Sequence, residues 1–387
     1  MTAVKSNSLV ARLSPPPIPS VVAWGREYKG LKGPLIDLSQ AVPGYPAHPE
    51  MLRLLGETAG QQAMTGYGPI EGEPLLRQAY AAHVAEVYGA DISAGNIHIT
   101  AGCNQAFMCT AIALAGAGDT VALTNPFYFN HDTTLSMLGI ERMLVDCDSA
   151  AGFLPDLGSA EAALSAGAKM LAVVTPNNPT GAVYPPELLH ALFRLCRKYG
   201  AWLVVDETYR DFLAEGYGRP HALLSEPGWE DTLVLLYSFS KSFCIPGHRL
   251  GAVTAGPGLV AEIAKVMDNM QICAPRSAQI AVASALPALA DWRAGNRLEI
   301  ARRADALRRA FSELVGWEIA AIGAYFAFVC HPFEGRSSSE VAEELARERG
   351  MVCIPGAYFG EGQARYLRFA FANVDVASIR LLPDRLR

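Results

Sequence analysis

Short, continuous apolar runs alternate with stretches of helical periodicity over most of the chain. Seven of these runs are predicted to be buried strands, over residues 97–100, 120–123, 142–145, 170–174, 201–205, 232–237 and 251–254. Helical stretches such as 186–199 lie between most of them. Because continuous apolar strands that alternate with helices are typical of parallel sheets covered on both faces, the pattern predicts an α/β fold. Its core would be a mostly parallel seven-stranded sheet.

The C-terminal third has a different pattern. A long amphipathic helix is predicted over 292–314 and a second helix near 338–349. Aromatic and apolar runs at 325–329 and 366–371 indicate antiparallel strands of a smaller α+β domain.

A chain of 387 residues is too long for one compact core, so we expect two domains. The large one is predicted over 41–285, and the small one is predicted to combine 1–40 with 286–387. Residues 1–20 are rich in proline and are expected to be extended or mobile, and such a segment could cross over a partner subunit.

Composition and charge exclude several classes of protein. The chain is 51% apolar with a net charge of -6, which argues against nucleic-acid binding. Its eight cysteines are scattered without C-x-x-C pairs or metal-ligand spacing, so we expect no metal and a reducing, cytoplasmic location. No signal segment and no 18-residue apolar run occur, so no membrane association is expected.

Polar motifs follow several of the predicted strands at their C-terminal ends. They cover residues 125–128, 175–181, 206–209 and 238–241. Any one of them could be an ordinary turn or helix cap, but four at the same sheet edge indicate a ligand site. After strand 97–100, Gly102 opens a helix whose free N–H groups could cradle an anion, although most such junctions bind nothing.

Lys241 lies just beyond the end of the core strand 232–237, where desolvation would lower the pKa of its amine. A neutral, nucleophilic lysine suits Schiff-base chemistry with a carbonyl, whereas an ordinary surface lysine is the alternative. Arg368 interrupts an apolar strand and therefore needs an anionic partner, either a structural carboxylate or that of a substrate. Gly44 could allow close ligand approach or be a plain turn residue, and Tyr67 could be a surface aromatic or a site phenol.

Read with Asn178, Asp206, Tyr209 and Arg249, Lys241 completes a pattern that resembles the class I/II aminotransferases. These are pyridoxal-phosphate enzymes of the aspartate-aminotransferase fold (fold type I). The resemblance runs from about Leu35 to Ala372 and rests on the order and spacing of its motifs. They are Asn178-Pro179-Thr180-Gly181, Asp206-x-x-Tyr209, Ser238-x-Ser240-Lys241, Arg249-Leu250-Gly251 and the late Arg368.

The resemblance implies a role for each residue. Lys241 would be the Schiff-base lysine and proton shuttle, Asp206 would pair with the pyridinium nitrogen, and Asn178 and Tyr209 would bind the phenolic oxygen. Tyr128 would stack on the ring. Phosphate contacts are implied for Gly102, Cys103, Asn104, Ser238, Ser240 and Arg249.

The resemblance also implies a homodimer, in which Tyr67 reaches the phosphate of the neighbouring subunit. Arg368 would hold the substrate α-carboxylate as a fork, with Asn178 and the backbone of Gly44 beside it. The chain departs from the family pattern at Thr208 and His248, neither of which removes a named role.

The implied reaction transfers an amino group from an L-amino acid to a 2-oxo acid. Arg276 does not match the second arginine of dicarboxylate-specific enzymes. A neutral or aromatic donor is therefore expected, with apolar and aromatic residues available at Tyr45, Ile70, Phe127 and Tyr358.

Two alternatives have the same or a related fold. A carbon–sulfur β-lyase would use the same lysine, aspartate and arginine. The ligand-binding domain of a transcription regulator would need an N-terminal winged helix-turn-helix, for which the Pro-rich segment before Leu35 is too short.

Overall fold

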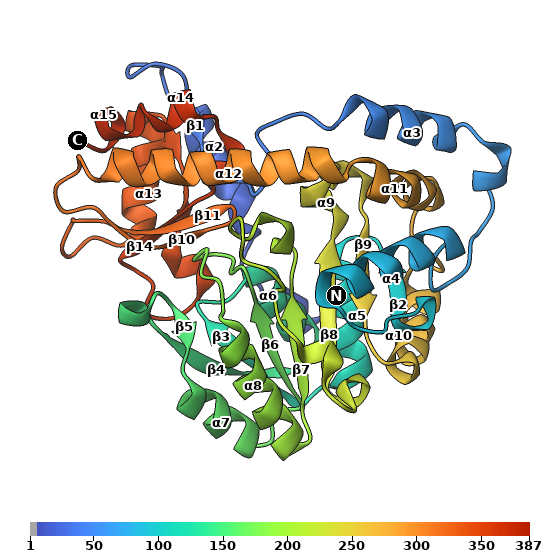
Figure 1. The fold of residues 1–387 in the computed structure, drawn as a ribbon. Helices are drawn as coiled ribbons and strands as arrows, with labels where there is room; N and C mark the ends of the chain where they lie inside the picture. Colours follow the sequence, from blue (N-terminus) through green and yellow to red (C-terminus); the bar gives the residue numbers. More distant parts are fainter. Residues whose placement is uncertain (1–5) are drawn as a thin grey trace, which may run out of the picture.

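The computed structural model describes residues 6–387 and is built on an eight-stranded sheet (Figure 1). The strand order is β2 (Ile97–Thr100), β9 (Gly251–Thr254), β8 (Leu233–Ser238), β7 (Trp202–Asp206), β6 (Met170–Val174), β3 (Thr120–Asn125), β4 (Glu141–Asp148) and β5 (Leu154–Pro155). Five neighbouring strands from β8 to β4 are parallel, and β9 is antiparallel to both β2 and β8. This confirms the mostly parallel sheet.

All seven predicted strands are present, and β5 is an eighth. It consists of two residues that pair antiparallel with the end of β4 at the edge of the sheet. Pro155 lacks a backbone N–H, which suits it to an edge but not to a central strand. A two-residue strand is too short to leave an apolar pattern, so the sequence does not predict it.

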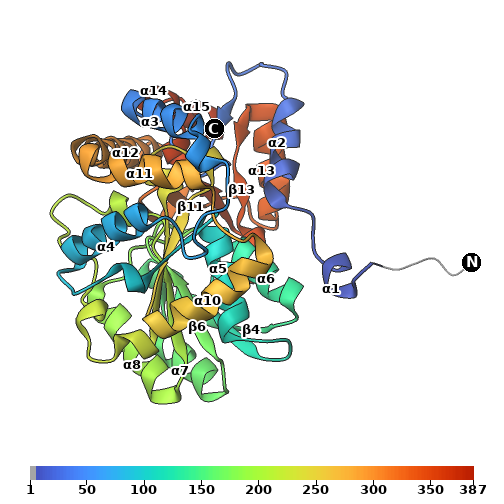
Figure 2. The same ribbon diagram turned by 90° about the vertical axis from the view of Figure 1, so that its right-hand side faces the viewer.

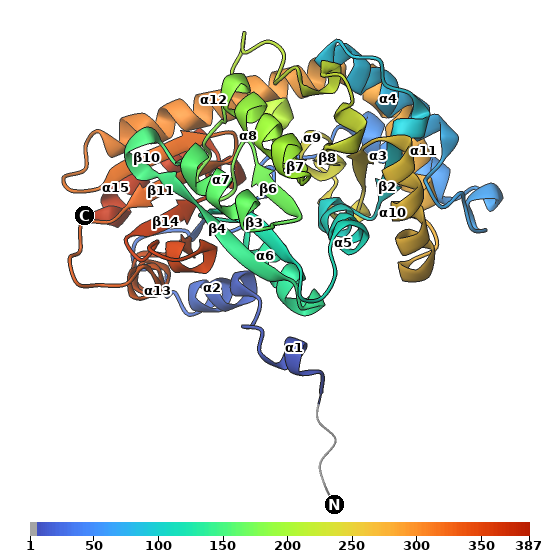
Figure 3. The ribbon, with the colours of Figure 1, turned by 90° about the horizontal axis from the view of Figure 1, so that it is seen from below.

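Helices cover both faces of this sheet. α5 (Cys103–Leu114) and α6 (Phe129–Leu138) lie on one face, and α7 (Leu157–Ser165) and α8 (Pro186–Tyr199) lie on the other (Figure 3). The buried positions of α8 are Leu189, Leu192, Phe193 and Cys196, which recur at helical spacing and face the sheet. Beyond the β2 edge, α11 (Arg276–Ala288) packs against α3 (Pro49–Ala59) and α4 (Pro74–Tyr88), and α10 (Pro257–Met270) packs against α5.

A second, antiparallel sheet forms the smaller unit. Its strand order is β10 (Glu318–Gly323), β11 (Phe326–Cys330), β14 (Tyr366–Phe369) and β13 (Ile354–Pro355), with α13 (Ser338–Arg349) packed against it. β1 (Ile36–Asp37) pairs in parallel with β12 (Met351–Val352), so segments from both ends of the chain meet here. The short helices α14 (Val376–Ile379) and α15 (Leu382–Leu386) complete this unit.

One long helix joins the two units. α12 (Ala290–Phe311) starts after α11 and runs along the top of the molecule to the small sheet (Figure 1). Near its far end, Arg303 is buried and donates from Nη1 to the carbonyl oxygen of Ala372 at 2.6 Å. The residue limits expected for the two domains, 41–285 for the large one and 1–40 with 286–387 for the small one, stay a prediction.

The expectation of an extended N-terminal segment is wrong for residues 8–11 and 17–20, which are helical. α1 (Ser8–Ala11) is a single turn, but α2 (Pro17–Arg26) is a helix that packs against α13 (Figure 2). Pro17 occupies the first helical position, where the fixed φ of proline favours a helix and its missing N–H costs nothing. The part of the expectation that concerns residues 1–5 lies outside the described residues.

Within residues 6–387, none of the helices combines the length and apolarity that a membrane span requires.

Gly181 makes a close contact between the two units, because its φ is +79° and an added Cβ would lie 2.3 Å from the carbonyl oxygen of Phe326. We expect Gly181→Ala to lower the free energy of unfolding by more than about 2 kcal/mol. The left-handed backbone alone costs about 1–2 kcal/mol, and the overlap with backbone atoms adds to it. Urea unfolding measures the loss.

Gly152→Ala is the matched control, because Gly152 has a φ of +70° but no atom within 4 Å of an added Cβ. Equal losses in the two variants would contradict the claim that the contact between the units sets the cost at Gly181.

Candidate active site

The polar motifs that follow the strands meet at one edge of the large sheet. Because β2, β6, β7 and β8 share a direction, their C-terminal ends lie together, and β9 starts at this same edge because it is antiparallel. A cavity of about 930 Å³ opens there. Eleven of the predicted site residues line it: Cys103, Asn104, Tyr128, Asn178, Asp206, Tyr209, Ser238, Ser240, Lys241, Arg249 and Arg368.

Lys241 lies in the one-turn helix α9 (Phe239–Ser242), directly after β8. Ser238 caps this helix, and the amine of Lys241 donates to the carbonyl oxygen of Ala41. Burial, together with the positive charges of Arg249 and Arg368, lowers the pKa of the Lys241 amine to about 8. A sizeable fraction of the amine is therefore neutral near pH 8, as a nucleophile or proton acceptor must be.

Asp206 ends β7 and is 4% exposed. Burial raises the pKa of its carboxyl, but hydrogen bonding and charge from His131, together with a hydrogen bond from Thr208, hold the pKa below its ordinary value. Nε2 of His131 lies 3.4 Å from Oδ2, and the backbone N–H of Thr208 donates to Oδ1 at 2.9 Å. The carboxylate is therefore kept negative inside the cavity.

A phosphate-sized cradle lies at the start of α5. Gly102 caps this helix with a φ of +88°, and an added Cβ would lie 2.3 Å from Nη2 of Arg249. A Cβ on Gly251 would lie 2.8 Å from the backbone nitrogen of Cys103, so only glycine allows β9 to pass this close. Arg249 itself donates only to backbone carbonyl oxygens, those of Pro246 at 3.0 Å and Ala101 at 3.4 Å.

Arg368 projects from β14 toward the opposite side of the cavity and is 2% exposed. Its Nη1 donates to Oδ1 of Asn178 at 2.9 Å, its Nη2 donates to the carbonyl oxygen of Ser39, and its Nε has no partner. Burial lowers the pKa of its guanidinium to about 10. No carboxylate of residues 6–387 forms an ion pair with it, which favours the substrate alternative over the structural one.

Three predicted residues do not line the cavity. Gly102 lies directly behind Arg249, consistent with its place in the cradle. Gly44 packs instead against the backbone of Asn373, because an added Cβ would lie 2.5 Å from its carbonyl oxygen, and the neighbouring residues 40–42 line the cavity. Tyr67 is 79% exposed on the surface.

Of the four apolar and aromatic residues expected near the substrate, two line the cavity and two do not. Phe127 and Tyr358 line the cavity, whereas Tyr45 and Ile70 do not. The Tyr209 ring packs on Tyr325 and Phe326, with centroids 5.3 and 5.0 Å away.

The sequence did not predict His131. It lies on α6, three residues after Tyr128, and its ring stacks on Phe107 with centroids 3.8 Å apart. That one-turn spacing from a predicted site aromatic is the signal that could have identified it. The chain segment 12–18 and Arg142 also border the cavity, and no motif marks either of them.

These residues fit the pyridoxal phosphate that the resemblance implies. Among residues 6–387, the buried Ser240 hydroxyl has no hydrogen-bond partner and the Arg249 guanidinium has no carboxylate partner, and both line the cavity near the α5 N-terminus, as a phosphate site requires. Asp206 offers a buried carboxylate to a ring nitrogen, and Lys241 a partly neutral amine to an aldehyde. When bound, the group supplies an electron sink for the bonds at the substrate α-carbon.

The Lys241 amine should react with an acylating reagent with a midpoint near pH 8 in folded, cofactor-free protein. In urea the midpoint should move to about 10.4, the ordinary value for lysine, because burial no longer disfavours the charged form. Arg249→Gln should raise the midpoint of the folded protein, since a nearby positive charge is removed. Peptide mass spectrometry measures the labelling at each pH, and a folded-state midpoint near 10 would rule out the perturbed amine.

Comparison with known proteins agrees with this geometry. The family Aminotransferase class I and II matches residues 34–386. An aromatic aminotransferase of Arabidopsis thaliana is 30% identical over 91% of this chain and 89% of its own length. A valine–pyruvate aminotransferase of Mycobacterium tuberculosis is 28% identical over 95% of both chains.

Solved structures show the same architecture. An aspartate aminotransferase of Thermus thermophilus, solved as a double mutant, superposes with a TM-score of 0.90 at 25% identity and covers 99% of both chains. The chain therefore belongs to the class I and II aminotransferases, a family of pyridoxal-phosphate-dependent enzymes.

Proposed function

We propose that this aminotransferase moves the amino group of a neutral or aromatic L-amino acid to a 2-oxo acid, with Lys241 as its covalent cofactor attachment and proton shuttle. One observation carries the proposal. The Lys241 amine and the Arg368 guanidinium line one cavity, and neither has a carboxylate partner within residues 6–387. An amine and a fork for a carboxylate are the two groups that α-amino acid chemistry requires.

Each remaining residue has a defined task in this proposal. Arg368 holds the substrate carboxylate as a fork, which turns the α-carbon toward Lys241. The neutral form of the Lys241 amine would take the proton from that carbon onto its Nζ and then give it to the bound cofactor, which regenerates the neutral amine. Asp206, held negative by His131, keeps a positive charge at the far end of the cavity. Arg249, Ser240 and the α5 N-terminus hold a phosphate.

The substrate class follows from the walls of the cavity. Phe127, Phe129 and Tyr358 line it and offer apolar surface to a neutral or aromatic side chain. Arg276 already has partners. Its Nε lies 2.5 Å from Oε1 of Glu73, and its Nη1 donates to the carbonyl oxygen of Ala63 at 2.7 Å. It is therefore not free to pair with a second substrate carboxylate in this subunit.

A homodimer is part of the proposal. The exposed Tyr67 is free to reach a neighbouring subunit. Exposed apolar side chains on nearby helices, Leu52 of α3 and Leu75 of α4, add surface that a second subunit would cover. We also propose that the enzyme works in the cytoplasm, where reducing conditions keep its eight free cysteines reduced.

The first test is an absorbance spectrum of the purified holoenzyme during titration with single amino acids, without any oxo acid. We expect neutral or aromatic amino acids to convert the cofactor to its amine form, and a 2-oxo acid to reverse the change. If ammonia and pyruvate accumulate without an oxo acid, the protein is instead a carbon–sulfur β-lyase.

Lys241→Ala should abolish both turnover and the covalent link between protein and cofactor, and retained turnover would reject the role of Lys241.

Arg368→Lys should raise the KM for every amino acid donor about tenfold or more, because lysine keeps the charge but loses the fork. Hydrogen bonds to charged groups contribute about 1.5–3 kcal/mol each. Steady-state kinetics with several donors measures the effect. Arg365→Lys is the control. Arg365 lies three residues before Arg368 in the chain, and it donates to the carbonyl oxygen of His331 outside the cavity. An unchanged KM with a lower melting temperature would assign Arg368 a purely structural role.

A further inference from the structure

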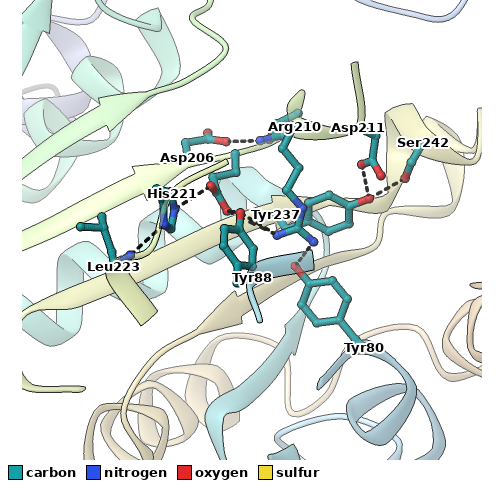
Figure 4. Close-up of polar contacts among 11 residues, drawn as sticks. Tyr80, Tyr88, Asp206, Arg210, Asp211, His221, Leu223, Tyr237 and Ser242 are labelled. Carbon is teal, nitrogen blue, oxygen red and sulfur yellow. Dashed lines mark hydrogen bonds and ion pairs between the residues drawn. The ribbon is translucent and has the colours of Figure 1, made fainter. Parts of the chain in front are cut away.

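A buried polar network lies behind the candidate active site, and none of its side chains lines the cavity (Figure 4). It joins α4, the ends of β7 and β8, α9, α12 and the one-turn 3-10 helix Arg210–Phe212. Its members are Tyr80, Tyr88, Glu207, Arg210, Asp211, His221, Tyr237, Ser242 and Arg293.

One branch of the network leads to Lys241. The Tyr237 hydroxyl lies 2.6 Å from Oδ2 of Asp211, to which it donates, and 2.8 Å from Oγ of Ser242 (Figure 4). Since a phenol has one proton, the Ser242 hydroxyl donates to Tyr237 in return. Asp211 is held in turn by Nη1 of Arg293 at 3.3 Å. Ser242 directly follows Lys241 in the chain, so this branch ends at the residue next to the reactive lysine in sequence.

Packing alone does not require the Tyr237 hydroxyl. The ring stacks on Tyr80 with centroids 5.3 Å apart, and the Arg210 guanidinium lies 4.3 Å from its centre. A phenylalanine would keep both contacts. A buried hydroxyl beside a buried carboxylate is costly unless each is paired, so the bonds to Asp211 and Ser242 are the specific feature of this position.

α9 needs such support from outside, because it has only four residues. A helix this short has few hydrogen bonds of its own, namely those from the backbone N–H groups of Phe243 to Phe239 and of Ile245 to Ser240 across its end. Besides the backbone hydrogen bond from the N–H of Phe239 to the carbonyl oxygen of Leu250 at 3.1 Å, its orientation depends on side chains that anchor its two ends. Ser238 anchors the start, and Ser242 anchors the end through Tyr237.

We propose that Tyr237 is a positioning residue for Lys241: its hydroxyl, held by Asp211 and Arg293, fixes Ser242 and so the turn that presents the lysine amine. The proposal rests on the role of Lys241 proposed above. Because Arg293 belongs to α12, the helix that joins the two units, the anchor also links the lysine turn to the small unit.

Tyr237→Phe tests the proposal. We expect kcat to fall about tenfold with KM changed less than twofold, because the substrate site stays intact while the amine loses its fixed orientation. Ser242→Ala should have the same effect. If the two residues act through one bond, the double variant should cost no more than either single one. Ser242→Ala also keeps the proposal testable if Tyr237→Phe does not fold.

A second readout does not depend on turnover. In cofactor-free protein, the rate at which the Lys241 amine is acylated at fixed pH should change at least threefold in Tyr237→Phe. Tyr80→Phe is the matched control, because it also removes a buried hydroxyl from the network, one that accepts from Nη2 of Arg210 at 3.1 Å. The Tyr80 ring packs on Phe239 of α9, and phenylalanine keeps that contact, whereas within residues 6–387 the Tyr80 hydroxyl forms no hydrogen bond to α9. That variant should lose stability while its kcat and its Lys241 labelling stay within twofold of the wild type.

Three results would overturn the positioning role of Tyr237. Equal effects of Tyr237→Phe and Tyr80→Phe on kcat would overturn the proposal, as would a Tyr237→Phe variant with unchanged labelling and only a lower melting temperature. Additive losses in the double variant would show that Tyr237 and Ser242 act separately, which also overturns it. Failure of the proposed function would give a different result, because the wild-type protein itself would then lack the covalent link between Lys241 and cofactor.

Discussion

The gathering of three positively charged side chains around one cavity, one of them buried, is the constraint on which the rest of the site depends. The Lys241 amine and the Arg249 and Arg368 guanidinium groups all line it, and Asp206 is the acidic residue among the predicted site residues there. Buried charges are stable only when they are paired or neutralised. The protein meets this condition partly by lowering the pKa of Lys241, and anionic groups of the ligands complete it. In the proposed function a phosphate beside Arg249 and a substrate carboxylate beside Arg368 would supply that negative charge.

The network behind the cavity shows the opposite arrangement. Glu207 pairs with Arg210, and Asp211 pairs with Arg293. Tyrosine hydroxyls form further hydrogen bonds with Glu207, Arg210 and Asp211. Paired groups of this kind hold a backbone in one conformation, whereas unpaired groups bind ligands. The two arrangements lie next to each other in the chain: Asp206 precedes Glu207, and Lys241 precedes Ser242. Each strand end thus supplies one side chain to the cavity and the next to the support behind it.

Sequence patterns predicted the parts of this fold that are locally encoded. The large sheet, α8 and α13 follow from apolar periodicity, and the polar motifs marked the right sheet edge because parallel strands end together. β10 was missed because its residues are only half-buried and alternate weakly. His131 was missed because its role depends on a contact with Asp206 from another strand, which no local pattern records. The place of Tyr67 opposite a second subunit stays a prediction, since it depends on contacts between chains.

The site also depends on how the two units pack. Asn178 follows β6 of the large sheet and Arg368 lies on β14 of the small one, yet they share a hydrogen bond of 2.9 Å. Three residues beyond Asn178, Gly181 lies so close to Gly323 that an added Cβ would be 2.4 Å from its backbone nitrogen. Ala41, which accepts from Lys241, follows the strand that pairs with β12. A shift between the units would therefore separate the Arg368 guanidinium from the Lys241 amine, so in the proposed function the glycine contact beside Asn178 would matter to the geometry of the reaction as well as to the fold.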